Sequence, residues 1–122
     1  MILSELKDFP GKIVKCFWEI DTYIKSKENI VTKENKTMIS YCVYSIRKGN
    51  SVVWVEPHDS NIKIHLCRPN KYSDRFHKIK PIGWGKYPEI EFKEEELGMY
   101  FSYIKELIDV AYKNKKIEIS GW

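Results

Sequence analysis

The alternation of hydrophobic and polar positions predicts an amphipathic helix near the start of the chain. Hydrophobic residues recur at steps of three and four between Ile13 and Ile24, with Lys15 and Glu19 at positions between them. Asp8, followed two residues later by Pro10, is typical of a helix start with the aspartate as N-cap. We therefore predict a helix over about residues 10–27 with one face in the core.

A second helix is predicted at about residues 94–113, where the hydrophobic stripe from Leu97 to Ala111 keeps helical spacing. Three consecutive glutamates open this segment, and lysines close it. That order of charges matches the dipole of a helix at both ends. The short tail that follows, residues 117–119, fits either an extra strand or a frayed end.

Between the two helices, runs of β-branched and aromatic residues predict four strands. The predicted strands cover residues 38–46, 51–56, 62–67 and 89–92. Residues 25–37 are polar and indicate a loop. Proline and glycine recur through residues 68–88, which favours a long irregular connection with a short helical turn near residues 71–76.

These elements predict a single α+β domain over residues 1–122, in the order α-β-β-β-β-α. Turn residues between consecutive strands favour a four-stranded antiparallel sheet at about residues 38–92. Such a sheet needs its apolar face covered, and the N- and C-terminal helices are available to pack on it. A chain of this length buries enough surface for a core of its own.

The three cysteines, Cys16, Cys42 and Cys67, indicate neither a disulfide framework nor a zinc site, because their number is odd and they form no CxxC pair. Buried free thiols fit a reducing compartment. The first residues lack the apolar region of a signal peptide, and apolar runs are too short to span a bilayer. We expect a soluble, cytoplasmic protein without a membrane partner.

Positive charge is concentrated between Lys63 and Lys86. This segment contains seven basic residues and one acidic residue, Asp74, which gives a formal charge of +6. Aromatic residues lie between these cations in the sequence. A nucleic-acid-binding surface needs both types, because cations contact the phosphates and aromatic rings stack on the bases. A solvated, lysine-rich loop is the simpler interpretation. The predicted nucleic-acid-binding residues are Lys63, Arg68, Lys71, Tyr72, Arg75, Lys78, Lys80, Trp84 and Lys86.

Trp84 stands between two glycines, which allow tight backbone geometry and the close approach of a partner. One interpretation is an aromatic platform for a base or a peptide. The other is a ring that folds back onto the sheet as part of the core.

Three short sets of residues have chemical types suited to catalysis or metal binding. They are His65 with Cys67, Glu56 with His58 and Asp59, and Glu89 with Glu91. The first is interpreted as two neighbours on one strand face, the second as a turn, and the third as a solvated strand face. The chain also lacks a glycine-rich phosphate loop, so we predict a non-enzymatic protein without a metal or cofactor.

Several motifs together resemble a known family. They are Tyr41-Cys42-Val43-Tyr44, Val55-Glu56-Pro57, Ile62-Lys63-Ile64-His65-Leu66, and the run from Pro81 to Phe92 that contains Gly-Trp-Gly-Lys-Tyr. Over about residues 10–114 the chain resembles an uncharacterised prokaryotic domain family labelled "predicted transport protein". Members of that family also form the C-terminal module of restriction-like nucleases of the GmrSD type. The chain departs from the family pattern at Lys86, where a glycine is expected.

The resemblance implies a domain that accompanies nucleic-acid-targeting defence systems, with a nuclease or another protein as partner; it supplies no catalytic residues. Together with the charge pattern, it favours a non-enzymatic binding module that contacts nucleic acid as an accessory of a restriction-type system. The alternative is a protein-interaction or small-ligand-binding domain that uses an aromatic surface around Trp84. The sequence leaves the ligand and the oligomeric state open.

Overall fold

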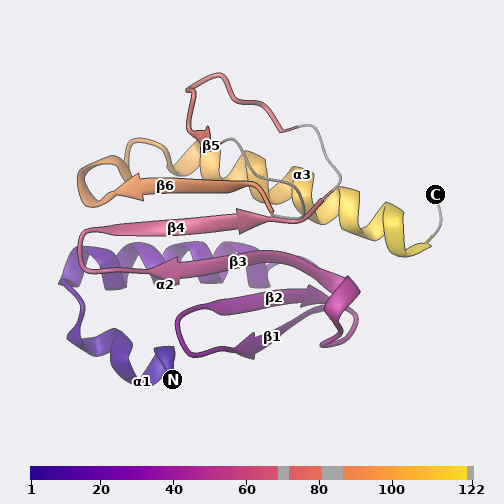
Figure 1. The fold of residues 1–122 in the computed structure, drawn as a ribbon, viewed down its shortest axis with the longest axis horizontal. Helices are drawn as coiled ribbons and strands as arrows, with labels where there is room; N and C mark the ends of the chain where they lie inside the picture. Colours follow the sequence, from indigo (N-terminus) through magenta and orange to yellow (C-terminus); the bar gives the residue numbers. More distant parts are fainter. Residues whose placement is uncertain (69–71, 81–86, 121–122) are drawn as a thin grey trace.

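The computed structural model, which describes residues 1–68, 72–80 and 87–120, has an α+β fold (Figure 1). Its α-helices are α1 (Ile2–Glu5), α2 (Gly11–Lys25) and α3 (Phe101–Ser120), and its 3-10 turns are η1 (Leu6–Asp8), η2 (Lys48–Asn50) and η3 (Glu94–Glu96). Its strands are β1 (Ile30–Glu34), β2 (Ile39–Val43), β3 (Ser51–Pro57), β4 (Asn61–Leu66), β5 (Ile79–Lys80) and β6 (Glu89–Lys93).

The six strands form one antiparallel sheet in the order β1-β2-β3-β4-β6-β5. Both long helices, α2 and α3, lie behind this sheet in Figure 1 and contact each other and the strands. The other side of the sheet has no helix over it among the described residues. We call this side the open face.

The core lies between the sheet and the two long helices. On β4, Ile62, Ile64 and Leu66 are buried, whereas the residues between them are only half-buried. This alternation is that of a strand with one face in the core. Phe17 of α2 and Leu107 of α3 complete the same hydrophobic cluster from the helix side. The prediction of an antiparallel sheet packed against the terminal helices is therefore confirmed.

The sheet has six strands rather than the predicted four. The extra strand β1 lies within residues 25–37, which were expected to form a loop, and β5 lies within the expected irregular connection. β1 is an edge strand with half-buried positions, so it lacks the hydrophobic alternation by which a strand is identified in sequence. β5 has only two residues and pairs with β6 alone.

The helix boundaries also differ from the prediction. α2 has Pro10, not Asp8, as its N-cap residue, and a separate short helix, α1, precedes it. The C-terminal segment begins with the 3-10 turn η3 and becomes α-helical only at Phe101. The tail at 117–119 is neither a strand nor frayed, because α3 continues through it to Ser120.

Two further differences concern a strand end and a predicted turn. The strand predicted at 38–46 ends at Val43, because Tyr44 has a φ of 73°, which an extended strand cannot contain. Of the short helical turn predicted near 71–76, residues 72–76 are not helical, and Lys71 lies outside the described residues. Across the described ranges, no helix is both long and apolar enough to cross a membrane.

Candidate functional site

One row of side chains crosses all six strands on the open face. Each member lies directly opposite the next in the strand register, which brings neighbouring side chains within contact distance. The row consists of Lys33, Ser40, Trp54, His65, Glu89 and Lys80. A second, shorter row joins Glu56, Lys63 and Glu91. The open face is therefore lined by polar and aromatic side chains, in contrast to the buried face.

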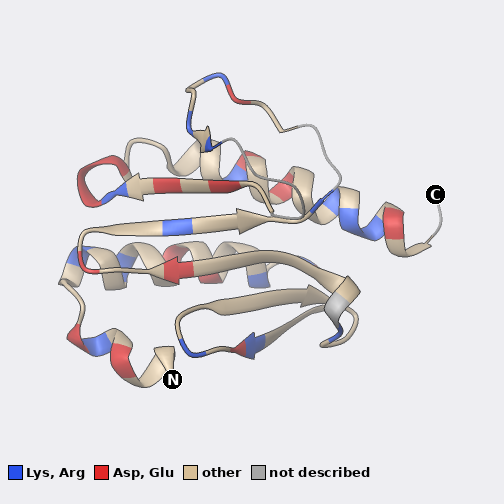
Figure 2. Ribbon diagram, viewed as in Figure 1, with Lys and Arg blue, Asp and Glu red and all other residues tan. Residues whose placement is uncertain are grey.

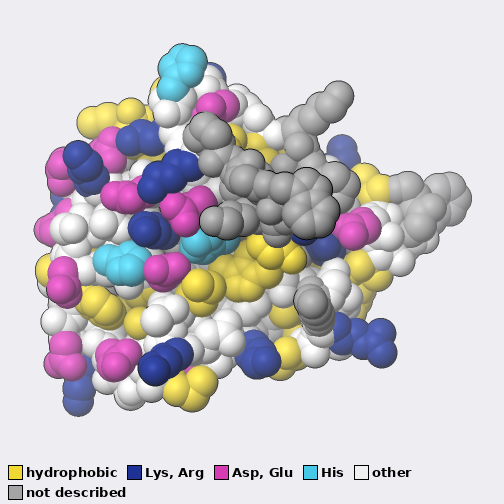
Figure 3. Space-filling view, in the orientation of Figure 1, with side chains coloured by type: hydrophobic (Ala, Val, Ile, Leu, Met, Phe, Trp, Pro, Cys, Tyr) yellow, Lys and Arg dark blue, Asp and Glu magenta, His cyan; other side chains and the backbone are white. Residues whose placement is uncertain are grey.

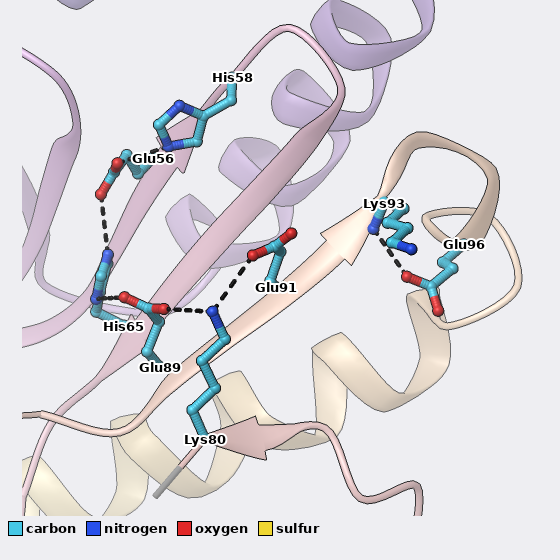
Figure 4. A network of polar contacts seen from close by, with 8 residues as sticks. All are labelled: Glu56, His58, His65, Lys80, Glu89, Glu91, Lys93 and Glu96. Atoms are coloured by element: carbon cyan, nitrogen blue, oxygen red, sulfur yellow. Dashed lines mark hydrogen bonds and ion pairs between the residues drawn. The ribbon is translucent and has the colours of Figure 1, made fainter. Parts of the chain in front are cut away.

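The half of this face formed by β3, β4, β6 and β5 carries a network of polar contacts (Figure 4). Glu56 joins two histidines, with Oε1 at 3.0 Å from Nε2 of His65 and Oε2 at 2.6 Å from Nε2 of His58. Nδ1 of His65 lies 3.7 Å from Oε1 of Glu89. The network therefore connects three strands through side chains alone.

Lys80 extends the network to the sheet edge. Its Nζ lies 3.2 Å from Glu89 and 3.4 Å from Glu91. Burial alone would raise the pKa of Glu89, but the hydrogen bond from Lys80 and the nearby His65 and Lys63 lower it below its ordinary value. Acidic and basic side chains alternate over these strands (Figures 2 and 3), so this half of the open face carries little uncompensated charge.

The other half of the open face, formed by β1, β2 and β3, contains a pocket of about 300 Å³, which we call the bulge pocket. It lies beside a β-bulge: Tyr41 pairs with Val53, but Cys42 pairs with Ser51, so β3 has one extra residue, Val52. Bulges reorient side chains and are common beside functional sites. Here the bulge brings the side chain of Ser51 to the same side as that of Cys42.

Three buried polar side chains form the floor of the bulge pocket. The Oγ atoms of Ser40 and Ser51 are 3.3 Å apart, and Sγ of Cys42 lies 3.5 Å from Oγ of Ser51. All three residues are buried and line the pocket. Each hydroxyl has one donor proton and two acceptor lone pairs, so contacts among these three groups do not exhaust their capacity. The floor can therefore hydrogen-bond to a ligand.

Aromatic and cationic side chains form the walls of the bulge pocket. The rings of Trp54 and Tyr87 pack with centroids 4.6 Å apart, and the guanidinium of Arg68 lies 4.8 Å from the centre of the Tyr87 ring. Lys33 and Arg47 also line the pocket, and both are exposed. In the described part of the chain, neither forms an ion pair with a carboxylate. Asn35 and Ile46 complete the lining.

The predicted nucleic-acid-binding residues that the structure describes lie in several different environments. Lys71, Trp84 and Lys86 lie outside the described residues. Three cations are paired with carboxylates: Arg75 with Glu106 of α3 at 2.7 Å, Lys78 with Glu96 of η3, and Lys80 with Glu89 and Glu91 of β6. Lys63 lies on the open face in register with Glu56 and Glu91, and Arg68 is exposed beside Tyr87.

Tyr72 faces the protein interior rather than a ligand. Its hydroxyl donates a hydrogen bond of 2.9 Å to the carbonyl of Cys67. Burial, followed by the neighbouring Cys67, raises the pKa of Tyr72 above its ordinary value, so the hydroxyl remains a donor. Among the described members of the predicted set, Lys63 and Arg68 are the cations that form no ion pair with a carboxylate.

The interpretation of His65 and Cys67 as neighbours on one strand face is wrong. His65 points to the open face, where it contacts Glu56. Cys67 follows the last residue of β4, and its Sγ lies 3.4 Å from the carbonyl of Ala111 on α3, so it belongs to the core side. Over the described ranges, no group of three or more His, Cys, Asp or Glu side chains is arranged to hold a metal ion.

A second hollow lies on the helix side, between α2 and α3, with a volume of about 580 Å³. Trp18, Tyr23 and Phe101 give it an apolar surface, and Lys15 and Glu19 add two opposite charges to its lining. Every residue that lines it is exposed or half-buried. It is therefore a groove on the surface, whereas the bulge pocket has a buried polar floor.

Sequence reasoning missed the residues of the bulge pocket. Trp54 gave a usable signal, since it alternates with the core residues Val53 and Val55 and therefore faces away from the core. Lys33 gave no signal in the sequence, because the strand β1 was not expected there. Ser51 gave none either, because the bulge changes the register of β3. Arg47 belongs to the segment that follows Tyr44, whose direction depends on the positive φ of that residue.

Comparisons of the chain with models of protein families, with curated proteins and with solved structures found no match.

Proposed function

We propose that the chain is a non-enzymatic binding module that holds an anionic ligand in the bulge pocket. This is the small-ligand alternative of the sequence analysis, with the aromatic surface at Trp54 and Tyr87 in place of Trp84. The observation that carries the proposal is that two cations, Lys33 and Arg47, line a pocket whose floor is made of buried hydroxyl groups.

The two halves of the open face differ in whether their cations are paired with carboxylates. Lys80 on the far half contacts two glutamates, which compensate its charge. Lys33 and Arg47 have no such partner in the part of the chain that the structure describes, so a bound anion would supply one. Hydrogen bonds between charged groups and hydroxyl or guanidinium donors are roughly twice as strong as those between neutral groups.

Arg47→Glu tests this proposal. We expect the affinity for inorganic pyrophosphate, measured by isothermal titration calorimetry, to fall at least about tenfold, because a donor is lost and a repulsive charge is added. Lys113→Glu on α3 is the matched control, since Lys113 is exposed, lies on the helix side and changes the net charge equally. Equal losses in both variants would show a non-specific charge effect and remove the proposal.

Nucleic-acid contact by the region between residues 63 and 86 is the second candidate. Its support is the formal charge of this region and the exposed guanidinium of Arg68 beside an aromatic ring. The ion pairs of Arg75 and Lys78 with carboxylates reduce the positive charge available to phosphates, which is why we rank it second. Charge reversal at Arg75 and Lys78 should weaken oligonucleotide binding only if the region between residues 63 and 86 contacts the nucleic acid. An accessory role in a restriction-type system, with a nuclease partner, stays a proposal from the resemblance.

A further inference from the structure

We infer that the ligand of the bulge pocket is a nucleotide, with its planar base against Trp54 and Tyr87 and its phosphate at Lys33 and Arg47. This inference rests on the proposed function, because it specifies which anion the pocket selects. Two separate chemical features of the lining lead to it, one aromatic and one cationic, and a third feature of the surrounding face limits the length of the ligand.

The aromatic feature is the pair of Trp54 and Tyr87. Both rings line the pocket, and Tyr87 keeps 37% of its surface exposed although it packs against Trp54 and Arg68. Exposed aromatic rings next to cations are the usual stacking surface for nucleobases, because every base has a flat π-face. A simple inorganic anion would make no use of these rings.

The cationic feature comes from other elements than the aromatic one. Lys33 is on β1, at the sheet edge, and Arg47 is in the segment between β2 and η2, whereas Trp54 is on β3. Ser40 lies between Lys33 and Trp54 in the strand register. A ligand with a charged group at one end and a flat ring at the other therefore matches the row from Lys33 to Trp54, with the hydroxyl of Ser40 between them available to a sugar.

The surrounding charges indicate that the ligand is short. Trp54 lies directly opposite His65, which contacts Glu56 and Glu89 on the next part of the open face. A phosphate backbone that continued from the pocket across β4 and β6 would gain little there, because the glutamates already pair with the nearby cations. The pocket therefore fits one nucleotide. That nucleotide is either a free molecule or the terminal nucleotide of a single-stranded nucleic acid.

The test compares ligands that each lack one part of a nucleotide. Calorimetric titrations use the four nucleoside monophosphates, their nucleosides and ribose 5-phosphate. We expect at least one monophosphate to bind, with its nucleoside at least about tenfold weaker and ribose 5-phosphate about five- to a hundredfold weaker. Equal binding of ribose 5-phosphate and the monophosphates would overturn the nucleotide inference but leave the anion-binding function intact. No binding of any phosphate would overturn both.

Two substitutions test whether the base of the ligand stacks on Trp54 and Tyr87. Trp54→Leu and Tyr87→Leu remove an aromatic ring but keep an apolar side chain, and circular dichroism checks that each variant is folded. Each should weaken monophosphate binding about fivefold or more and leave pyrophosphate binding within twofold. Unchanged monophosphate affinity in the folded Tyr87→Leu variant would contradict the stacking, even if Trp54→Leu fails to fold.

Oligonucleotides of increasing length distinguish the two sources of the nucleotide. Tighter binding of a dinucleotide than of a monophosphate, with no further gain at six nucleotides, would assign the site to a strand end. Equal or weaker binding would assign it to the free nucleotide. An affinity and a salt dependence that keep increasing with length would contradict the short ligand, because they indicate contacts with many phosphates.

Discussion

At the scale of single residues, a buried hydrogen bond between Tyr41 and Asp21 ties the sheet to α2. The hydroxyl of Tyr41 donates to Oδ1 of Asp21 at 2.7 Å, and both residues are buried. Burial, followed by this hydrogen bond and the aspartate charge, raises the pKa of Tyr41, so the hydroxyl stays protonated and remains a donor. Lys25 also reaches Asp21, at 3.2 Å. The carboxylate therefore depends on two donors in a nearly dry environment.

Tyr41→Phe should lower the free energy of unfolding by about 1–3 kcal/mol, because it leaves a buried carboxylate without one of its donors. Urea denaturation followed by circular dichroism measures the change. Tyr44→Phe serves as the control, since Tyr44 is exposed and is expected to change stability by less than about 0.5 kcal/mol. A loss at Tyr41 no larger than that of the control would contradict this account of the contact.

At the scale of elements, the segment at residues 72–80 is held to the C-terminal elements by side chains. Arg75 pairs with Glu106 of α3, Lys78 pairs with Glu96 of η3, and the hydroxyl of Tyr103 donates to the carbonyl of Ser73 at 2.5 Å. Glu96 also accepts a hydrogen bond of 2.9 Å from the backbone of Lys93. These contacts fix a segment that contains only the two-residue strand β5.

Glu96→Gln should make stability less sensitive to acid. The hydrogen bond from Lys78, followed by that from the Lys93 backbone, lowers the pKa of Glu96 below its ordinary value of 4.5. A lowered folded-state pKa stabilises the fold above pH 4.5, and this contribution is lost as the pH falls through the folded-state value.

We therefore expect the variant to be about 0.5–1 kcal/mol less stable than the parent at pH 7, with a difference that shrinks toward zero at lower pH. Urea denaturation at pH 7 and at several points below pH 4.5 measures it. The glutamine still accepts the backbone hydrogen bond, so the ion pair is tested by itself. A difference that stays constant with pH would show that the charge of Glu96 has no part in it.

Periodicity predicted the elements that bury hydrophobic residues on one side, such as α2, β4 and β6. It did not predict β1, because an edge strand with half-buried positions has no regular alternation. The extension of α3 to Ser120 was also missed, although it contains a local contact: Lys115, which is buried, pairs with Glu118 three residues later at 2.9 Å. β1 forms because it pairs with β2, and a single sequence does not reveal that pairing.

At the scale of the whole molecule, the two sides of the sheet have different roles. One side is covered by α2 and α3 (Figure 1) and forms the core, and the other presents charged, histidine and hydrophobic side chains (Figure 3). The sequence has an excess of positive charge between residues 63 and 86. The carboxylates that compensate much of this charge in the fold come from β6, η3 and α3. Proximity in sequence does not tell which charges meet in the fold.

The bulge pocket depends even more on the whole molecule, because its lining comes from β1, β2, β3 and the two segments that contain Arg47 and Tyr87. Its position on the open face also separates it from the groove at Trp18, on the far side of the sheet. Ligand binding at these two places would therefore perturb different sets of residues, which makes the location of binding measurable.

The most direct test is a heteronuclear NMR titration of the protein with nucleoside monophosphates. The indole signal of Trp54 is assigned by its loss in Trp54→Leu. We expect this signal and the amides of Ser40, Cys42, Arg47 and Ser51 to shift together and to saturate with one affinity. Shifts centred on Trp18 and Phe101, or an open face that stays unperturbed at saturating ligand, would contradict it.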